Sequence, residues 1–316
     1  MTFDSTSTAS DVIAGHDLSG VNAVVTGGAA GLGAETARAL ASAGARVTLA
    51  VRDTARGETA ARRIAAETGN PRVEHTELDL ASLASVRACA ARLLDRGEPL
   101  HLLVNNAGVM ATPLTFTADG FESQFGINHI GHFALTTALY PVLRAADGAR
   151  VVVLSSRAHR RGDVDFDDPN YRHRPYDPWE SYGQSKSANA LFARGLTDRW
   201  ADAGVTANAV QPGMIMTDLQ RHIPRDELIE LGWADADGNI ITPPGWKTVE
   251  QGAATPVWAA VAPELGGIGG RYLDNCAIAE PWTSGGDPPH GHYLPRILDP
   301  DLADRLWTLS EKLIAA

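Results

Sequence analysis

Tyr182 and Lys186 are the residues whose types and spacing most clearly suggest chemistry. Four positions separate them, so in a helix both would lie on one face. The chain has 24 arginines but only three lysines, so a lysine at this position is unusual. A phenol with a pKa of about 10 is a poor acid or base at neutral pH. An adjacent ammonium lowers that pKa toward the range useful for general acid–base catalysis, so we interpret the pair as a candidate acid–base site.

Ser155 and Ser156 end an apolar run over 149–156. A hydroxyl at the end of a buried strand can hydrogen-bond a carbonyl oxygen that gains negative charge during a reaction. Serine is also a common turn residue, so position alone leaves both interpretations open.

A glycine-rich turn, TGGAAGLG over 26–33, lies between an apolar run and an Ala-rich amphipathic run. Glycines let the backbone approach a pyrophosphate, and the N-terminus of the next helix offers free N–H groups to it. The turn therefore predicts a dinucleotide site. Its candidate contacts are Gly27, Ala29, Ala30, Gly31, Leu32 and Gly33.

The second apolar run ends in LAVRD, which bears on the choice of cofactor. An acidic residue at this strand end would hold a ribose 2′-hydroxyl, whereas arginine accommodates a 2′-phosphate. Here Val51 occupies the slot and Arg52 follows, which favours NADP(H) over NAD(H). Asp53 competes for the acidic role but fits better as the N-cap of the next helix.

Two later strand ends carry further candidate cofactor contacts. Asp79, followed by Leu80, could accept a hydrogen bond from an adenine amino group, or could simply cap a helix. Asn106, Ala107 and Gly108 could contact a ribose, or could simply form a turn.

These side chains need a framework that brings strand ends together. Short apolar runs alternate with amphipathic runs of ten or more residues throughout 17–213. This pattern predicts a single α/β domain: a Rossmann-like, doubly wound parallel sheet of about seven strands with helices on both faces. We expect the domain to span 17–275, with one long helix over 120–146. A flexible arm over 1–16 would precede it, and a C-terminal extension with a terminal helix over 276–316 would follow it.

Composition excludes several classes of protein. The net charge of −11 argues against a nucleic-acid partner. The longest basic cluster, RAHRR at 157–161, precedes DVDFDD and is interpreted as a solvated loop. The sequence contains no run of about 18 apolar residues, so we predict no membrane span. The N-terminus does not resemble a secretory signal, and we therefore expect a cytoplasmic protein. Cys89 and Cys276 could form one disulfide, but two free thiols are favoured. The HGH sequence at 290–292 is too sparse for a metal site, and we predict none.

The motifs together resemble the compact short-chain dehydrogenase/reductases. In the family's order they are TGGAAGLG (26–33), Asp79-Leu80, NNAG (105–108), Asn128 in GINHIGHF, Ser156, Tyr182-x-x-x-Lys186 and PGMIMT (212–217). LAVRDTARG, LSSRAHRRG and DRLWTLSEKL further resemble the retinol-dehydrogenase-like branch, which mostly prefers NADP(H).

The resemblance implies catalytic roles. Tyr182 would be the proton donor and acceptor, Lys186 would bind ribose and tune Tyr182, and Ser156 would position the carbonyl. Asn128 would hold the long helix in a water-relay geometry toward Lys186.

The resemblance also implies contacts to both ligands. Pro212, Gly213, Ile215 and Thr217 would contact the cofactor beside Tyr182 and Lys186. A lid over about 214–247 would cover the substrate with Met214, Met216 and Leu219 next to Ser156. Ser156 and Tyr182 are 26 residues apart, about twice the family's usual spacing, so the extra segment should form a loop over the site.

The expected function is NADP(H)-dependent interconversion of a lipophilic ketone or aldehyde and its alcohol. Two alternatives are a catalytically silent NADP(H)-binding sensor and a sugar-nucleotide epimerase or dehydratase. The resemblance also implies pairing of the long helices at 120–146 and 179–203 between subunits, as a homodimer or homotetramer.

Overall fold

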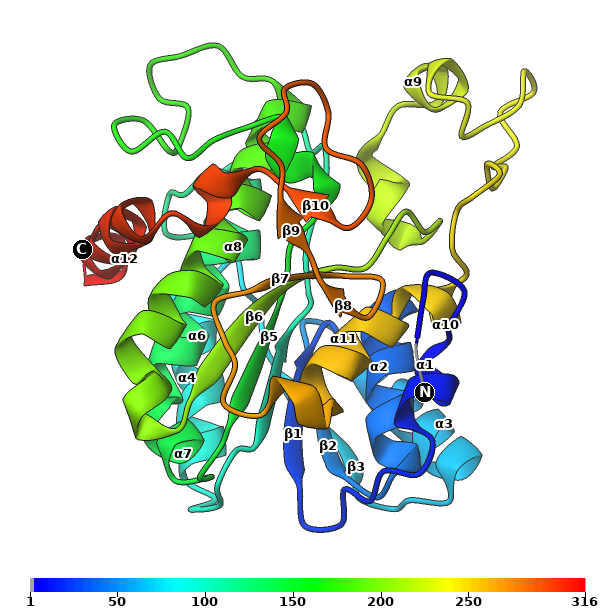
Figure 1. Cartoon of the computed structure of the whole chain (residues 1–316), viewed down its shortest axis with the longest axis vertical. Coiled ribbons are helices and arrows are strands. Elements are labelled where there is room, and N and C mark those ends of the chain that lie inside the picture. Colours follow the sequence, from blue (N-terminus) through cyan, green and yellow to red (C-terminus); the bar gives the residue numbers. More distant parts are fainter. Residues whose placement is uncertain (1–2, 316) are drawn as a thin grey trace.

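A mostly parallel sheet organises the computed structural model, which describes residues 3–315 (Figure 1). The strand order is β3-β2-β1-β4-β5-β6-β7-β8, with β1 to β7 parallel and β8 antiparallel to β7. The strands are β1 (Asn22–Thr26), β2 (Arg46–Val51), β3 (Val73–Glu77), β4 (Leu102–Asn105), β5 (Arg150–Leu154), β6 (Thr206–Gln211), β7 (Tyr272–Asp274) and β8 (Ala277–Ile278). The order reverses at β1 and β4, which opens a crevice at their carboxyl ends.

Helices cover both faces of the sheet. Their bounds are α1 (Ala9–Ile13), α2 (Gly31–Ser42), α3 (Thr54–Thr68), α4 (Leu83–Leu94), α5 (Ser123–Phe125), α6 (Gly131–Ala138), α7 (Tyr140–Arg144), α8 (Pro178–Trp200), α9 (Arg225–Glu230), α10 (Val249–Gly252), α11 (Ala254–Val261) and α12 (Pro300–Ala315). One apolar core joins α2, α3 and α11 to the sheet, and a second joins α4, α6 and α8 to the opposite face. Burial on both faces explains why the central strands are continuous apolar runs.

The main sheet has eight strands rather than about seven. The additional strand, β8, follows β7 after a tight turn in which Asn275 and Cys276 have positive φ. Beyond it, β9 (Glu280–Pro281) and β10 (His292–Tyr293) form a separate two-residue pair. The chain therefore continues the sheet past residue 275, and the expected boundary there is wrong.

The N-terminal segment is docked, which corrects the expected flexible arm over 1–16. Within the described part, 3–16, a capping box between Thr8 and Asp11 starts α1. Ala9, Val12 and Ile13 are buried against the core that contains α11. The prediction missed them because a single helical turn with three apolar residues carries little periodic signal. Residues 1 and 2 lie outside the described part.

The region expected as one helix over 120–146 is divided. It consists of α5, a π-helical turn over Gly126–Ile130, α6 and α7. Pro141 explains the last interruption, because proline cannot donate the hydrogen bond that continues a helix. π-Helical turns are frequent at functional sites, and this one contains Asn128.

The terminal helix α12 packs along α8 and against the π-helical turn. The Trp307 ring takes part in this contact, because it lies against Phe192 and Trp200 of α8 and against Phe133 of α6. The buried His129 ring also lies 2.8 Å from the Ser310 hydroxyl, measured from Nε2 to Oγ. The predicted pairing of α8 between subunits stays a prediction.

Three composition-based predictions concern the described residues. Cys89 and Cys276 are buried free thiols, as favoured. Over 3–315, no helix combines the length and apolarity needed to cross a membrane. In the same range, no three His, Cys, Asp or Glu side chains are grouped as a metal site would require.

Candidate functional site

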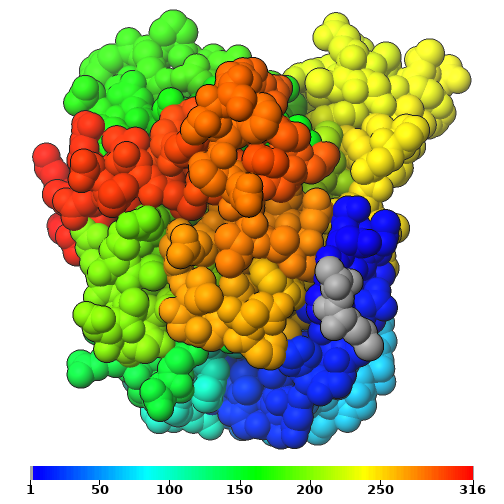
Figure 2. All heavy atoms as spheres, viewed as in Figure 1, coloured from blue at the N-terminus to red at the C-terminus, as the bar shows by residue number. Residues whose placement is uncertain are grey.

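Three cavities meet at the carboxyl edge of the sheet, around the crevice at β1 and β4. One of about 300 Å³ lies beside Arg52 and Asp79, and one of about 520 Å³ lies beside the glycine turn and Thr217. A third of about 420 Å³ contains Ser156 and Tyr182. Figure 2 shows a notch between the segment 214–247 and the C-terminal loop in this region. The first two cavities would suit the two ends of a dinucleotide and the third a substrate.

The glycine turn forms a close cradle. Gly27 and Gly31 have φ values of +66° and +53°, which favour glycine. A Cβ on Gly33 would lie 2.4 Å from the Gly27 carbonyl oxygen and 2.5 Å from Asn106 Nδ2. Among the described side chains none caps the N-terminus of α2 at Ala30. The free N–H groups of this helix therefore remain available to an anion.

The strand ends hold this cradle together. The Thr26 hydroxyl accepts hydrogen bonds from the backbone N–H groups of Asn106 (2.9 Å) and Ala107 (3.0 Å). The Asn106 amide donates to the Thr26 carbonyl at 2.8 Å. The predicted contacts lining the first two cavities are Gly27, Ala29, Ala30, Gly31, Leu32, Gly33, Arg52, Asp79, Leu80, Asn106, Ala107, Gly108 and Thr217. The cradle and the free helix end fit a dinucleotide.

Three arginines line the 300 Å³ cavity: Arg52, Arg56 and Arg221. Burial lowers the pKa of Arg221, and the nearby positive charges of Arg52 and Arg56 lower it further. Asp218 offsets part of this charge, with a carboxylate oxygen 3.8 Å from Arg56. Asp53 accepts from the Arg56 backbone N–H at 3.0 Å, so it caps α3 as predicted. Sequence reasoning missed Arg56 and Arg221.

Asn128 joins two elements of the site. Its amide oxygen accepts from the Val109 backbone N–H, and its amide nitrogen donates to the Val109 carbonyl and to the Ser185 hydroxyl, all at 2.9 Å. The segment after β4 is thereby fixed to α8, one residue before Lys186. The Asn128 carbonyl oxygen lies 2.9 Å from His132 Nδ1. Burial lowers the pKa of His132 to about 4, so its ring is neutral at pH 7.

Tyr182 and Lys186 both lie on α8, in the predicted relation. Lys186 Nζ donates to the Leu154 carbonyl at 3.0 Å and lies 5.6 Å from the centre of the Tyr182 ring. Burial lowers the pKa of Lys186 to about 8. Lys186 does not line the three cavities, but its Nζ lies 3.8 Å from where a Cβ on Gly108 would stand.

The pKa of Tyr182 corrects a sequence-based expectation. Burial raises it to about 12, although a hydrogen bond with the Ser156 side chain acts in the opposite direction. We expected Lys186 to lower it toward neutrality. The loss of hydration around the phenol dominates instead, so Tyr182 is in its neutral, proton-donating form at pH 7.

The two adjacent serines have different roles. The Ser155 hydroxyl donates to the Lys186 carbonyl at 2.8 Å and so ties β5 to α8. The Ser156 hydroxyl accepts from the Ala158 backbone N–H at 3.1 Å and lies beside Tyr182. Ser156 is therefore the serine placed to meet a ligand.

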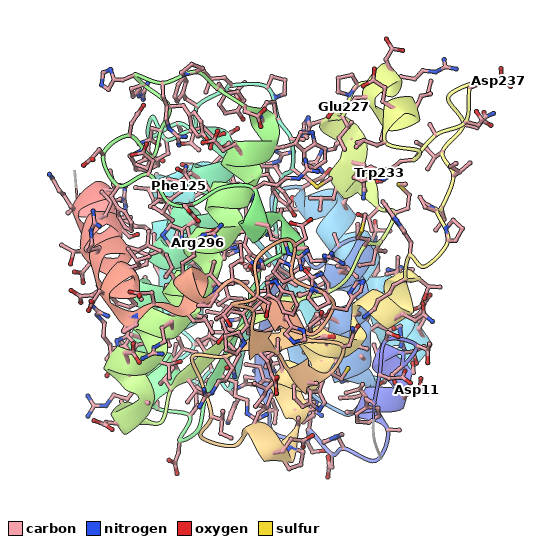
Figure 3. The ribbon with its side chains drawn as sticks, turned by 45° about the horizontal axis from the view of Figure 1, so that its top comes forward. Asp11, Phe125, Glu227, Trp233, Asp237 and Arg296 are labelled. Atoms are coloured by element: carbon pink, nitrogen blue, oxygen red, sulfur yellow. The ribbon has the colours of Figure 1, made fainter. Side chains whose placement is uncertain are left out.

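The segment 214–247 forms one wall of the 420 Å³ cavity. It contains a 3-10 turn over Asp218–His222 and the short helix α9, which begins after Pro224. Figure 3 places Glu227 and Trp233 on this segment and Asp237 at its tip. The Trp179 indole N–H donates to the Glu227 carboxylate, which ties the segment to the start of α8.

The lining of this cavity differs in part from the prediction. Pro212, Gly213, Met214, Ile215 and Leu219 line it, whereas Met216 lines the 520 Å³ cavity on the cofactor side. The cavities thus group these side chains differently from the prediction, which placed Met216 with the substrate and Pro212, Gly213 and Ile215 with the cofactor. Trp233 and Trp246, within the predicted lid over 214–247, also line it, whereas the prediction missed Met110, Trp179, Arg157, Arg160 and Arg161. The clearest signal for the arginines was RAHRR, interpreted above as a solvated loop.

Only the two ends of the insertion line the cavity, through 157–161 and Trp179. The middle of the insertion was expected to lie over the site. Instead, the Gln184 amide of α8 donates to the Pro169 carbonyl in the middle of the insertion at 2.8 Å. The start of the insertion also packs closely on α8, because a Cβ on Gly183 would lie 2.6 Å from the Gly162 N and the Ala158 carbonyl.

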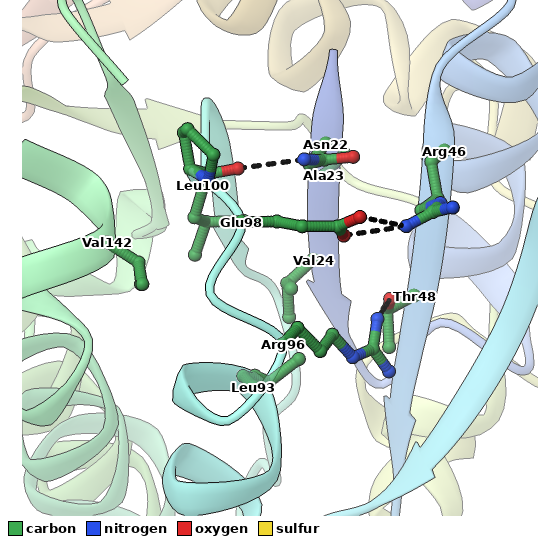
Figure 4. Close-up of a pocket in the computed structure, with 11 residues that line it drawn as sticks. Asn22, Ala23, Val24, Arg46, Thr48, Leu93, Arg96, Glu98, Leu100 and Val142 are labelled. Atoms are coloured by element: carbon green, nitrogen blue, oxygen red, sulfur yellow. Dashed lines mark hydrogen bonds and ion pairs between the residues drawn. The ribbon is translucent and has the colours of Figure 1, made fainter. Parts of the chain in front are cut away.

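A smaller cavity of about 30 Å³ lies near the start of β1 and β2 (Figure 4). Arg46 and Glu98 are paired there at 2.6 Å, and the Asn22 amide donates to the Pro99 carbonyl at 2.9 Å. The polar groups in this cavity already have partners, and its volume suits only about one water. This cavity is therefore too small for a substrate, unlike the cavities at the carboxyl edge of the sheet.

Relatives of known name cover nearly the whole chain. The family model described as "short chain dehydrogenase" matches residues 21–228. A Streptomyces lividans protein named "Probable oxidoreductase" is 48% identical, over 95% of this chain and 99% of its own. Mouse polyprenol dehydrogenase is 44% identical, over 93% and 84%. Human retinol dehydrogenase 13 is 39% identical, over 94% and 85%.

Solved structures show the same fold. An uncharacterised protein from Mycobacterium paratuberculosis superposes with a TM-score of 0.71 at 37% identity, covering 98% of this chain and 97% of its own. The Pseudomonas aeruginosa RhlG/NADP active-site complex has a TM-score of 0.63 at 26% identity, covering 81% and 95%.

Proposed function

Because the chain belongs to the short-chain dehydrogenase/reductase family, we propose that it is an NADP(H)-dependent oxidoreductase that interconverts a lipophilic ketone or aldehyde and its alcohol. One observation carries the proposal. Tyr182 is a buried, neutral phenol that shares a cavity with Ser156, next to the dinucleotide cradle. This arrangement suits proton transfer to a carbonyl oxygen at a position that a nicotinamide can reach.

The cofactor would be held by three parts of the site. The glycine turn and the N-terminus of α2 would bind the pyrophosphate, and the arginines around Arg52 would bind a 2′-phosphate. Lys186, beside Gly108, would bind the nicotinamide ribose. The bound nicotinamide would supply or accept the hydride.

Tyr182 and Ser156 would act on the substrate oxygen. The Ser156 hydroxyl would donate a hydrogen bond to the carbonyl, where negative charge develops. Tyr182 would donate its proton to that oxygen in reduction and take it back in oxidation. The Lys186 ammonium, near the ring, would stabilise the phenolate that forms. Asn128 would keep these groups in register by fixing the Val109 segment to α8.

Support for a lipophilic substrate comes from the walls of the cavity. The rings of Trp233 and Trp246 lie 5.0 Å apart in an edge-to-face pair, and Trp179 lies 6.0 Å from Trp233. Met110 and Met214 add further apolar surface. Aromatic and methionine side chains favour an apolar ligand body. The names of the retinol and polyprenol dehydrogenases point the same way.

Cofactor preference tests the proposal directly. With a panel of aliphatic and aromatic aldehydes, we expect kcat/KM for NADPH to exceed that for NADH. In the variant Arg52→Asp, kcat/KM for NADPH should fall about tenfold to a hundredfold, because a charge-assisted contact to the 2′-phosphate is replaced by repulsion from a carboxylate. Arg87→Gln, an exposed change on α4, is the control. Equal use of both cofactors by the natural protein would refute the role of Arg52. A lack of turnover with either cofactor would favour a silent binding protein.

A pH profile tests the role of Lys186. Because kcat/KM for NADPH reports ionisations of the free enzyme, it should decline as the pH rises through about 8, where Lys186 loses its proton. Tyr182, with a pKa of about 12, ionises too high to explain such a decline. In Lys186→Arg the positive charge persists at high pH. The decline in kcat/KM should therefore occur at a higher pH, even if kcat/KM itself is lower. An identical profile for both proteins would assign the decline to another group.

A further inference from the structure

Three arginines face the substrate cavity. Arg157, Arg160 and Arg161 lie on or next to the 3-10 turn that directly follows Ser156, and all three line the cavity that contains Tyr182. Asp287 is the one carboxylate among the described residues that line it. The cavity wall therefore carries an excess of positive charge although the whole chain has a net charge of −11.

Carboxylates do not neutralise these arginines. Across residues 3–315, none of the three lies within 4.0 Å of a carboxylate oxygen. Arg157 Nη1 instead lies 3.0 Å from His290 Nε2. The Arg161 guanidinium lies 5.0 Å from the centre of the Trp179 ring. Arg160 Nε is buried and lacks a hydrogen-bond partner within the described structure.

Two of the acidic residues that follow in the sequence are paired with other arginines. Asp163 pairs with Arg296 from the C-terminal segment, and Asp165 lies 3.4 Å from Arg174. The run DVDFDD therefore does not balance RAHRR, although the two are adjacent in sequence. RAHRR was interpreted as a solvated loop, but its arginines also line the cavity.

The unpaired charge makes the cavity favourable for an anion. Burial lowers the pKa of Arg160, the charge of Arg157 lowers it further, and Asp287 acts in the opposite direction. A partly buried guanidinium without a partner has lost hydration that it has not replaced. A carboxylate or phosphate would supply paired acceptors that match the planar guanidinium.

The geometry points to a substrate that joins a carbonyl and an apolar body to an anionic group, a carboxylate or a phosphate, bound by Arg157, Arg160 and Arg161. This inference rests on the proposed function, because it assumes that Tyr182 and Ser156 act on the carbonyl. The tryptophans that line the same cavity, Trp179, Trp233 and Trp246, would cover the apolar body. Since Arg157 follows Ser156 directly, the cationic wall begins beside the hydroxyl that would meet the carbonyl.

Matched aldehydes test this assignment with the full chain and NADPH. The first pair is 12-oxododecanoate and its methyl ester, and the second is 4-formylphenyl phosphate and 4-methoxybenzaldehyde. In at least one pair, we expect kcat/KM for the anionic aldehyde to exceed that for its neutral partner by about tenfold to a hundredfold. The pair with the larger ratio shows whether the site prefers a carboxylate or a phosphate. High salt should reduce that ratio. In Arg160→Gln the ratio should fall toward one, mainly through KM.

Two further variants keep the test valid if Arg160→Gln does not fold. Arg161→Gln changes an exposed side chain and should lower the same ratio, whereas Arg144→Gln, exposed on α7 and remote from the cavity, should leave it unchanged. Thermal melting would verify that each variant is folded. A ratio near one in the natural protein for both pairs would overturn the inference while leaving the proposed function intact.

Binding separates the two proposals. Dodecanoate and methyl dodecanoate cannot be reduced under these conditions, and three tryptophans that line the cavity provide a fluorescence signal. We expect dodecanoate, or dodecyl phosphate if the phosphate pair shows the preference, to bind more tightly than methyl dodecanoate. Tighter anion binding without turnover of any aldehyde would support the anion site and refute the proposed function. Equal binding of all three would refute the anion site.

Discussion

Tyr182→Phe should lower kcat for aldehyde reduction by about a hundredfold to ten-thousandfold, the usual contribution of a positioned proton donor. The variant removes only the phenolic hydroxyl. The ring still fills its buried place on α8, so the fold and the NADPH affinity should be retained. Steady-state NADPH oxidation and a fluorescence titration of NADPH would measure the two effects separately.

Tyr140→Phe is the matched control. Tyr140 stacks on Trp200, with ring centres 4.4 Å apart, far from the cavities at the carboxyl edge. This variant loses the same hydroxyl and should keep full activity. Near-normal turnover by Tyr182→Phe would mean that another group supplies the proton, and the assignment of Tyr182 would have to be abandoned.

Gly33→Ala should have the next largest effect, on cofactor binding. The new Cβ would lie 2.4 Å from the Gly27 carbonyl oxygen, so the glycine turn must move. Overpacking of this kind costs about 1–3 kcal/mol. If the turn moves to relieve the clash, the affinity for NADPH should fall about tenfold to a hundredfold. Titration of NADPH and a thermal melt would show how the strain divides between binding and stability.

Gly69→Ala separates general destabilisation from damage to the cradle. Gly69 ends α3 with a φ of +68°, and no atom lies within 4 Å of its added Cβ. Alanine there costs about 1 kcal/mol of stability through backbone strain alone, and NADPH should bind normally. Comparable losses of affinity in both glycine variants would show that the cradle is not a specific binding element.

The local features of the chain were predictable from the sequence. The cap at Asp53 is formed by residues three apart and is present as expected. The caps at Ser82 and Thr248 are formed by equally local contacts. The i,i+4 relation of Tyr182 and Lys186 is equally local and follows once α8 forms. The family resemblance is confirmed by relatives that cover most of the chain.

Features that depend on distant parts of the chain were not predictable in this way. Arg221 lines the same cavity as Arg52, although 169 positions separate them in the sequence. The pairing of Asp163 with Arg296 depends on a segment 133 residues away. The pKa of Tyr182 reflects how completely its surroundings exclude water, which spacing in the sequence does not reveal.

The contact between His129 and Ser310 shows that the four motif residues Asn128, Ser156, Tyr182 and Lys186 do not by themselves define the site. Ser310 lies 181 positions beyond His129, yet it supports the turn that carries Asn128. A form of this chain truncated before residue 300 would retain all four motif residues and lose that support. A motif search would score such a fragment as intact, although the turn that carries Asn128 would lack one side of its packing.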